Sequence, residues 1–282
     1  MNKKTWKYIF GVQILAILSL SIALFSLNSR RFKLIACDVG QGDAILAIYG
    51  NLEILNDGGP DSKVIECLDK YMPYWDREIE LVILSHPDKD HFGGLIDVFE
   101  RYKVDSFLRT KAKSSTQSFQ MLENLVGGEG IETIYAKEGL RLRLGKIYLD
   151  ILNPINSESL LSGDVDLNNS SIVFNLSFGE FNALLTGDIE IEGINKMVSG
   201  RRIRDIEYLK VPHHGSSNNI TTGLLMFSKP EISAISVGKN SYGHPNKETL
   251  ELLARYKIKV LRTDEIGDIV IEANEDGTFY LD

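Results

Sequence analysis

The stretch Ser85-His86-Pro87-Asp88-Lys89-Asp90-His91-Phe92-Gly93-Gly94 concentrates four side chains that can bind a metal ion within six residues. It directly follows the apolar run Leu81-Val82-Ile83-Leu84, which is typical of a buried strand. Imidazole and carboxylate groups supply nitrogen and oxygen ligands to divalent ions, and a strand end fixes the direction in which they point. The pattern therefore predicts a metal site where this strand ends. The alternative is an exposed acidic loop with two incidental histidines.

The other histidines follow the same rule of position. All five lie in short motifs flanked by glycine or proline, each directly after a predicted strand: His86, His91, His213, His214 and His244. Asp57, Asp188 and Asn169 occupy equivalent positions along the chain. If these strand ends meet at one edge of a sheet, the side chains gather in a single cleft.

Strand-like segments occur in both halves of the chain, with helical patterns between them. Phe32–Cys37, Ala44–Tyr49 and Leu52–Asn56 are predicted strands of the first half, and Ile172–Phe178 and Phe181–Leu185 belong to the second. Two strand-rich halves with interspersed helices indicate an α/β (α+β) fold in which two packed sheets are flanked by helices.

Composition limits the classes of protein to consider. A length of 282 residues with 43% hydrophobic residues fits one large globular domain or two small ones. Cys37 and Cys67 are the only cysteines, which excludes a disulfide-rich scaffold and a zinc site built on cysteines. Whether they pair does not follow from the sequence, and two buried free thiols are the default expectation.

The charge is unevenly distributed. Residues 1–30 contain four of the 31 basic residues and none of the 39 acidic ones, so the remainder has 27 basic and 39 acidic residues and a net charge of −12. Nucleic-acid-binding domains normally show a basic footprint. The acidic remainder counts against a nuclease without excluding one.

The N-terminal segment is apolar. Tyr8 to Leu27 contains no charged residue, and about twenty such residues suffice to cross a bilayer as a helix. We therefore expect residues 1–31 to form a single membrane anchor and residues 32–282 to form the functional domain, outside the cytoplasmic membrane. A cleaved secretory signal is the alternative. The basic residues on both sides of the apolar segment leave the orientation nearly balanced.

The motifs, taken in order, resemble those of metallo-β-lactamase-fold hydrolases, and more specifically the hydrolase domain of ComEC-type DNA-uptake competence proteins. The resemblance covers roughly residues 33–282. The motifs that carry it are Asp38-Val39-Gly40-Gln41-Gly42-Asp43, Asp57-Gly58-Gly59, His86 to Gly94, Asn168-Asn169-Ser170-Ser171, Leu185-Thr186-Gly187-Asp188, Pro212-His213-His214-Gly215-Ser216 and Gly243-His244-Pro245. It implies an αββα sandwich with one or two metal ions at the sheet edge.

The resemblance also implies roles for individual residues. Metal ligands are expected among His86, Asp88, Asp90, His91, Asp188 and His213, and catalytic roles are expected for Asp90 and His214. Asp188 would bridge two ions, and either histidine of the 213–214 pair would complete the ligand set. Substrate-binding or supporting roles are expected for Asp57, Asn168, Asn169, Ser216 and His244.

Some of these roles stay open. Asp57 is expected to accept a hydrogen bond from a ligand imidazole and so fix its tautomer. Asn169 is a weak ligand, a donor to a substrate oxygen or a turn residue. His244 binds metal or substrate. Asp43 is expected to form hydrogen bonds within its turn, with substrate contact as the alternative.

Two departures from the broader fold bear on the metal. Asp88 stands where many relatives have histidine, and the Asn168-Asn169 pair stands in a region where they have a further metal-binding histidine. Oxygen ligands shift the preference from zinc toward manganese or magnesium. We therefore expect one or two divalent ions, manganese or zinc, with magnesium as a further candidate.

The expected function is a membrane-anchored, metal-dependent hydrolase of phosphodiester bonds, a competence-type nuclease that acts on DNA outside the membrane. With one predicted span the chain would need a separate channel protein as a partner in DNA uptake. Hydrolysis of a smaller phosphodiester or ester, such as a cell-wall component or a lipid head group, is an alternative. A non-catalytic, membrane-tethered binding module is another.

Overall fold

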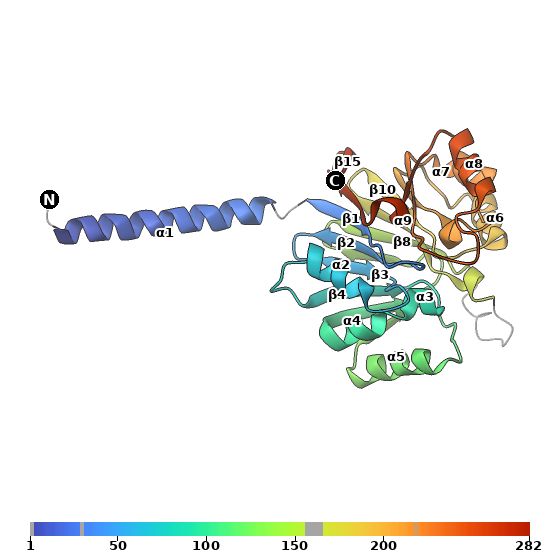
Figure 1. The fold of residues 1–282 in the computed structure, drawn as a ribbon, viewed down its shortest axis with the longest axis horizontal. Helices are drawn as coiled ribbons and strands as arrows, with labels where there is room; N and C mark the ends of the chain where they lie inside the picture. The colour runs from blue at the N-terminus through green and yellow to red at the C-terminus, as the bar shows by residue number, and fades with distance from the viewer. Residues whose placement is uncertain (1–2, 29–30, 156–165, 218) are drawn as a thin grey trace.

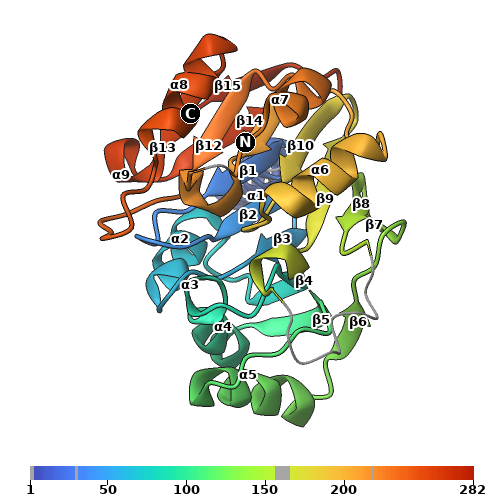
Figure 2. The ribbon, with the colours of Figure 1, turned by 90° about the vertical axis from the view of Figure 1, so that its right-hand side faces the viewer.

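The computed structural model describes residues 3–28, 31–155, 166–217 and 219–282. Two β-sheets lie face to face, and helices cover their outer surfaces (Figure 1 and Figure 2). The eight-stranded sheet has the order β15-β14-β1-β2-β3-β4-β5-β6, and the seven-stranded sheet has the order β13-β12-β11-β10-β9-β8-β7. This arrangement confirms the predicted sandwich of two sheets flanked by helices.

The strands of the first sheet are β1 (Phe32–Ala36), β2 (Ile45–Tyr49), β3 (Glu53–Asn56), β4 (Glu78–Leu84), β5 (Lys103–Arg109), β6 (Glu132–Tyr135), β14 (Ile269–Ala273) and β15 (Phe279–Leu281). Those of the second are β7 (Arg141–Leu144), β8 (Ile147–Asn153), β9 (Val173–Phe178), β10 (Phe181–Leu185), β11 (Tyr208–Lys210), β12 (Ile232–Ile235) and β13 (Lys259–Arg262). The helices are α1 (Lys3–Asn28), α2 (Lys63–Tyr71), α3 (Lys89–Phe92), α4 (Leu95–Arg101), α5 (Gln117–Gly128), α6 (Ile191–Ser199), α7 (Thr222–Ser228), α8 (Lys247–Arg255) and α9 (Thr263–Ile266).

Apolar side chains fill three layers. One layer lies between the two sheets, a second between the first sheet and helices α2, α4 and α5, and a third between the second sheet and helices α6, α7 and α8. Successive residues of a strand point to opposite faces, so Leu34 of β1 joins the central layer and Ile35 joins the outer one. Strands that are buried on both faces are mainly apolar, as in β2, whose sequence is Ile45-Leu46-Ala47-Ile48-Tyr49.

Parallel strands determine where the polar motifs gather. β3, β4 and β5 run parallel in the first sheet, and β10, β11 and β12 run parallel in the second. Their carboxyl ends therefore lie at the same edge of each sheet, and the predicted motifs follow these strands directly. This edge, with α3, faces the viewer in Figure 2.

Cys37 and Cys67 form a disulfide bond, so the expectation of two free thiols is wrong. Cys37 directly follows β1, and Cys67 lies on the buried face of α2, with 5.9 Å between the two Cα atoms. Residues 30 apart meet because α2 packs against the outer face of the first sheet. Their proximity depends on that packing and on no local sequence pattern.

The predicted membrane-spanning helix is not supported. Helix α1 covers Lys3–Asn28, and residues 1, 2, 29 and 30 of the predicted anchor lie outside the described residues. Within the described part of the chain, no helix combines the length and the apolarity that a membrane span requires.

Glu53 begins β3, and its side chain is fully buried. Burial, followed by the charges of Asp76 and Glu80, raises the pKa of Glu53 from 4.5 to about 8. Between these two values the folded protein holds a proton that the unfolded chain has released. The free energy of unfolding therefore falls as the pH rises through this window.

We expect Glu53→Gln, which cannot ionise, to remove this loss. At pH 8.5 the variant should exceed the wild type in free energy of unfolding by about 2 kcal/mol, with little difference near pH 4.5. Urea denaturation in the presence of a chelator at both pH values measures the effect. Exposed Glu180→Gln is the control, and equal pH dependence in Glu53→Gln and the wild type would contradict the prediction.

Candidate metal centre

Three loops that contribute to the site pack backbone against backbone. The amide N of Asp43 donates to the carbonyl O of Asp90 (3.2 Å), and the N of Gly58 donates to the O of His91 (2.7 Å). A Cβ at Gly94 would lie 2.2 Å from the carbonyl O of Gly58, and one at Gly42 would lie 2.3 Å from that of Asp90. Only glycine permits this close approach, which explains why the chain places glycines beside its acidic residues.

Four side chains converge where the loops meet: Asp90, His91, Asp188 and His214. One ligand atom from each lies within 4.8 Å of the others. The Oδ2 atom of Asp188 is 3.4 Å from Nε2 of His91 and 3.3 Å from Nε2 of His214. Nε2 of His214 is also 3.5 Å from Oδ2 of Asp90. Two carboxylates and two imidazoles facing one point form a ligand set suited to a divalent ion.

The opposite nitrogens of these two imidazoles are held by other groups. Nδ1 of His91 lies 3.0 Å from Oδ2 of Asp57, whose Oδ1 accepts from the backbone N of Ser85 (2.7 Å). Nδ1 of His214 donates to the carbonyl O of Ser236 (2.8 Å). In the neutral form of both rings the proton therefore lies on Nδ1, and the Nε2 lone pair faces the cluster. Among the described residues, these buried Nε2 atoms have no hydrogen-bond partner.

His86 and Asp88 face each other beside the cluster. Nε2 of His86 is 3.5 Å from Oδ2 of Asp88, and it too is buried without a hydrogen-bond partner among the described residues. The rings of His86 and His91 lie 4.2 Å apart between centroids. Nδ1 of His86 is 3.0 Å from Oγ of Ser85. This pair offers donors for a second ion next to the first.

The cluster has a strong affinity for positive charge. Burial opposes protonation of His91 and His214, but nearby carboxylates, with Asp188 foremost, outweigh it. They raise the pKa of His91 well above its usual value and that of His214 to about 10. Burial opposes ionisation of Asp188, but His214, His91 and Lys210 hold its pKa well below the usual range. A divalent ion would replace the protons that His91 and His214 gain on Nε2, so metal binding should release these protons.

A buried lysine, Lys210 at the end of β11, lies on the inner side of the cluster. Its side chain is about 1% exposed, and its Nζ forms an ion pair with Asp43 and donates to the carbonyl O of Gly187 (3.0 Å). It also lies 3.5 Å from Oδ1 of Asp188. Asp43, Asp57 and His91 form a second group of metal-binding type, but the ammonium of Lys210 already pairs with Asp43 in it.

Sequence reasoning missed Lys210 and placed Asp43 within its own turn. Asp43 is instead fully buried beside the two ligand imidazoles, with Oδ1 3.5 Å from Nδ1 of His214 and Oδ2 3.7 Å from Nδ1 of His91. The available signal was the single lysine within the apolar run Tyr208-Leu209-Lys210-Val211. A charged residue in a buried strand needs a buried partner of opposite charge.

The asparagine pair lies outside the metal-binding cluster. Oδ1 of Asn169 accepts from the backbone N atoms of Glu190 (3.2 Å) and Gly193 (3.3 Å), which start α6, and its Nδ2 donates to Asp166 (2.6 Å). Asn168 donates to Oε1 of Glu190 (3.0 Å). Of the three roles considered for Asn169, the structure places it in the turn, where it caps a helix.

The two histidines of the 213–214 pair point in different directions. Their backbones have positive φ values of 50° and 52°, a conformation that turns the second ring into the cluster. His213 stays at the rim, with Nε2 3.7 Å from Oδ2 of Asp188. Its Nδ1 accepts from Nδ2 of Asn219 (2.8 Å), which places the proton of the neutral ring on Nε2. Of the pair, His214 and not His213 therefore belongs to the four-residue cluster.

His244 lies beside both histidines of the 213–214 pair, and Ser216 follows that pair along the chain. The ring of His244 is 5.5 Å from that of His213 and 6.5 Å from that of His214. The carbonyl O of Ser216 accepts from Oγ1 of Thr249 (3.0 Å). Neither side chain belongs to the four-residue cluster.

Solved structures identify the class of fold. The metallo-β-lactamase-fold protein YhfI from Bacillus subtilis superimposes with a TM-score of 0.58 and 13% identity, over 86% of this chain and 100% of that one. The metallo hydrolase Igni18 from Ignicoccus hospitalis gives 0.56 and 14%, with the same coverage. No protein-family model matches the chain. The chain is a metallo-β-lactamase-fold protein.

Sequence relatives narrow the class. The chain is 31% identical over 207 residues to ComE operon protein 3 of Bacillus subtilis, and the match covers 73% of this chain and 26% of the relative. It is 29% identical over 273 residues to Recombination protein 2 of Haemophilus influenzae, and this match covers 95% of this chain and 32% of the relative. The chain therefore spans about a quarter to a third of these relatives, and within that part it is ComEC-like.

Proposed function

We propose that this protein is a metal-dependent phosphodiesterase that cleaves DNA. The observation that carries the proposal is the cluster of Asp90, His91, Asp188 and His214, whose imidazole Nε2 atoms face two carboxylates without another partner among the described residues. These residues would hold one divalent ion, and His86 and Asp88 would contribute to a second. Mixed nitrogen and oxygen donors suit manganese or zinc, with magnesium as a further candidate.

The bound ion would supply a nucleophilic water at neutral pH. Asp57 and Ser236 keep the ligand imidazoles in the tautomer that binds metal. His213 lies at the rim, and burial lowers its pKa, so its ring is neutral near pH 7. With Asn219 on Nδ1, it presents an Nε2 proton to a substrate phosphate oxygen. We therefore propose that His214 binds the metal and that His213 donates a hydrogen bond to the substrate.

DNA is proposed as the substrate because of the relatives. Their names include ComE operon protein 3, Recombination protein 2 and, from Neisseria gonorrhoeae, Competence protein ComA. Each is a much longer protein, so their activities and partners come to this chain only as a proposal. A separate channel protein would serve as its partner in DNA uptake.

We place the domain outside the cytoplasm. The disulfide between Cys37 and Cys67 supports this location, because disulfides persist in oxidising compartments and are rare in the cytosol. Attachment to the membrane through residues 1–31 stays a prediction of the sequence. Alkylation of the thiols in protein taken directly from cells tests the location, since free thiols at both cysteines would contradict it.

The nuclease proposal predicts manganese-stimulated cleavage of single- or double-stranded DNA by the full chain. Asp90→Ala should lower the rate at least about 1,000-fold, because it removes a ligand of the metal that activates water. Asp105→Ala, which removes a partly exposed carboxylate on β5, is the matched control and should leave the rate unchanged. Metal-loaded wild type that cleaves no nucleic acid would refute the nuclease.

The acidic body favours a second candidate, a hydrolase of smaller phosphodiesters or esters, since the net charge of −12 outside residues 1–30 repels long polyanions. A panel of aryl phosphodiesters, lactones and β-lactams separates the two. Turnover of an aryl phosphodiester without DNA cleavage would favour the smaller substrate. Stoichiometric metal without any turnover would favour a binding module.

A further inference from the structure

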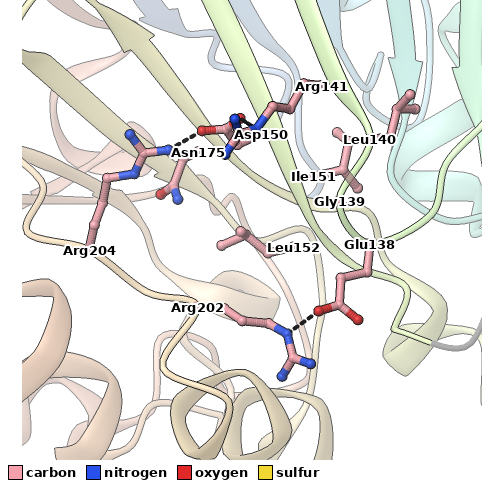
Figure 3. Close-up of a pocket in the computed structure, with 10 residues that line it drawn as sticks. All are labelled: Glu138, Gly139, Leu140, Arg141, Asp150, Ile151, Leu152, Asn175, Arg202 and Arg204. Atoms are coloured by element: carbon pink, nitrogen blue, oxygen red, sulfur yellow. Dashed lines mark hydrogen bonds and ion pairs between the residues drawn. The ribbon is translucent and has the colours of Figure 1, made fainter.

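Basic residues concentrate in two segments of this otherwise acidic body. Residues 137–143 and 196–205 together contain seven basic residues and two acidic ones. The basic ones are Lys137, Arg141, Arg143, Lys196, Arg201, Arg202 and Arg204. The first segment leads into β7, and the second follows the last turn of α6. Tertiary structure brings them together around a pocket on the outer side of the second sheet (Figure 3).

The pocket has a volume of about 230 Å³, and its polar lining includes three arginines. Arg141 and Arg204 approach from opposite sides and both pair with Asp150, while Arg202 pairs with Glu138 (Figure 3). The Nε atom of Arg141 lies 2.9 Å from Oδ1 of Asp150. Two carboxylates thus hold three guanidinium groups, which leaves an excess of one positive charge among these five side chains.

These arginines remain accessible to a ligand. The side chain of Arg141 is 81% exposed and that of Arg204 is 43% exposed, whereas Asp150, which orients both, is 25% exposed. Guanidinium groups held in place by a less exposed carboxylate are suited to binding phosphate through paired N–H donors. The arrangement resembles a phosphate site more than a set of isolated surface ion pairs.

Asn175 of β9 provides a second observation. Its side chain is buried in the lining of the pocket, next to the Arg204–Asp150 pair (Figure 3). Neither its Nδ2 nor its Oδ1 has a hydrogen-bond partner among the described residues. A buried amide without partners is unusual. A ligand that draws Arg204 outward would open both atoms to hydrogen bonding.

Helix α6 links the His213 side of the metal centre to the pocket. α6 begins beside Glu190, whose Oε1 is 3.7 Å from Nδ1 of His213, and ends near Arg202, which donates to the carbonyl O of Lys196 (3.1 Å). Nine helical residues span about 13 Å. One strand of duplex DNA carries a phosphate about every 3.4 Å of helix axis, so this distance, measured along that axis, corresponds to about four nucleotides.

We propose that this pocket binds a phosphate-bearing nucleotide unit of the DNA strand whose reacting phosphodiester lies at the metal centre. The inference rests on the proposed nuclease function and adds a binding site remote from the chemistry. It explains how an acidic body can hold a polyanion, since the strand would contact a local group of arginines. A free nucleotide carries the same chemistry, and the experiment separates the two sources.

The test measures binding of labelled oligonucleotides of 2, 4, 8 and 12 nucleotides to the full chain by fluorescence anisotropy, in the presence of a chelator. Arg141→Gln/Arg204→Gln should weaken binding of the 8- and 12-nucleotide strands about tenfold and lower the salt dependence by about one released ion per arginine. Binding of the dinucleotide should not change. Arg255→Gln, at an exposed position on α8, is the control. Circular dichroism of each variant confirms folding.

Each outcome bears on the proposal. Equal losses at all lengths, no loss, or the same loss in Arg255→Gln would overturn it. Competition by a free mononucleotide that disappears in the double variant would also overturn it, because the ligand of the pocket would then be a free nucleotide and not the DNA strand. Binding is measured without metal, so it is independent of cleavage. Binding that depends on strand length, without cleavage in the metal-loaded protein, refutes the nuclease alone. Cleavage together with binding that does not depend on strand length refutes the pocket alone.

Discussion

Asp188→Asn is expected to abolish stoichiometric metal binding. One oxygen of Asp188 faces Nε2 of both His91 and His214 at 3.4 and 3.3 Å, and the other lies 3.5 Å from Nζ of Lys210. The amide is neutral, so it would no longer balance the positive charge of Lys210 and of the two imidazoles or the ion that they bind. Changing a residue that merely supports a ligand typically costs 10- to 100-fold in metal affinity, so loss of a central ligand should exceed about 100-fold.

Elemental analysis of manganese-loaded full-length protein, after removal of free ion, measures the effect. Wild type should retain at least about one ion per chain and Asp188→Asn almost none. Asp205→Asn, which changes an exposed aspartate paired with Lys229, is the control and should retain the wild-type content. Stoichiometric manganese in Asp188→Asn would show that the cluster is not the metal site.

The same assay distinguishes the two neighbouring histidines. His214→Ala should lose metal, because its Nε2 belongs to the cluster and its Nδ1 is fixed by Ser236. His213→Ala should retain metal, since Asn219 engages its Nδ1 and its ring lies at the rim. The opposite result would restore the assignment expected from the sequence.

Lys210→Met is expected to destabilise the fold by about 3–5 kcal/mol, the usual cost of removing one partner of a buried ion pair. Burial opposes the charge on Lys210, but Asp43 and Asp188 outweigh it and raise the pKa of the ammonium, so the group is charged. Without it, both carboxylates stay buried with less positive charge nearby. Urea denaturation in chelator measures the change without a contribution from bound metal.

Asp43→Asn in the Lys210→Met background provides the decisive comparison. If the two groups interact as the structure indicates, the double variant should be less destabilised than the two single changes combined. Lys229→Met removes an exposed lysine paired with Asp205 and should change stability by less than about 0.5 kcal/mol. A Lys210→Met variant within about 1 kcal/mol of the wild type would contradict the proposed role of the buried pair.

Much of the fold follows from local patterns in the sequence. Apolar runs of strand length, each followed by a polar motif, predict both the strands and the loops that carry the candidate site. The predicted strand Phe181–Leu185, for example, is β10 with the same bounds. The prediction of separate free thiols failed because Cys37 and Cys67 meet only through the packing of α2 on the sheet. No periodicity encodes that contact.

The order of motifs along the chain is enough to predict that Asp90, His91, Asp188 and His214 lie near one another, because parallel strands place their carboxyl ends, and the motifs that follow, side by side. Tertiary structure decided what each residue does there. The positive φ values of His213 and His214 direct the ring of His214 into the cluster. Asn169 accepts hydrogen bonds at the start of α6, and Lys210 of the second sheet pairs with Asp43, next to β2 of the first. These outcomes depend on side-chain direction and on contacts between distant segments, and spacing along the chain specifies neither.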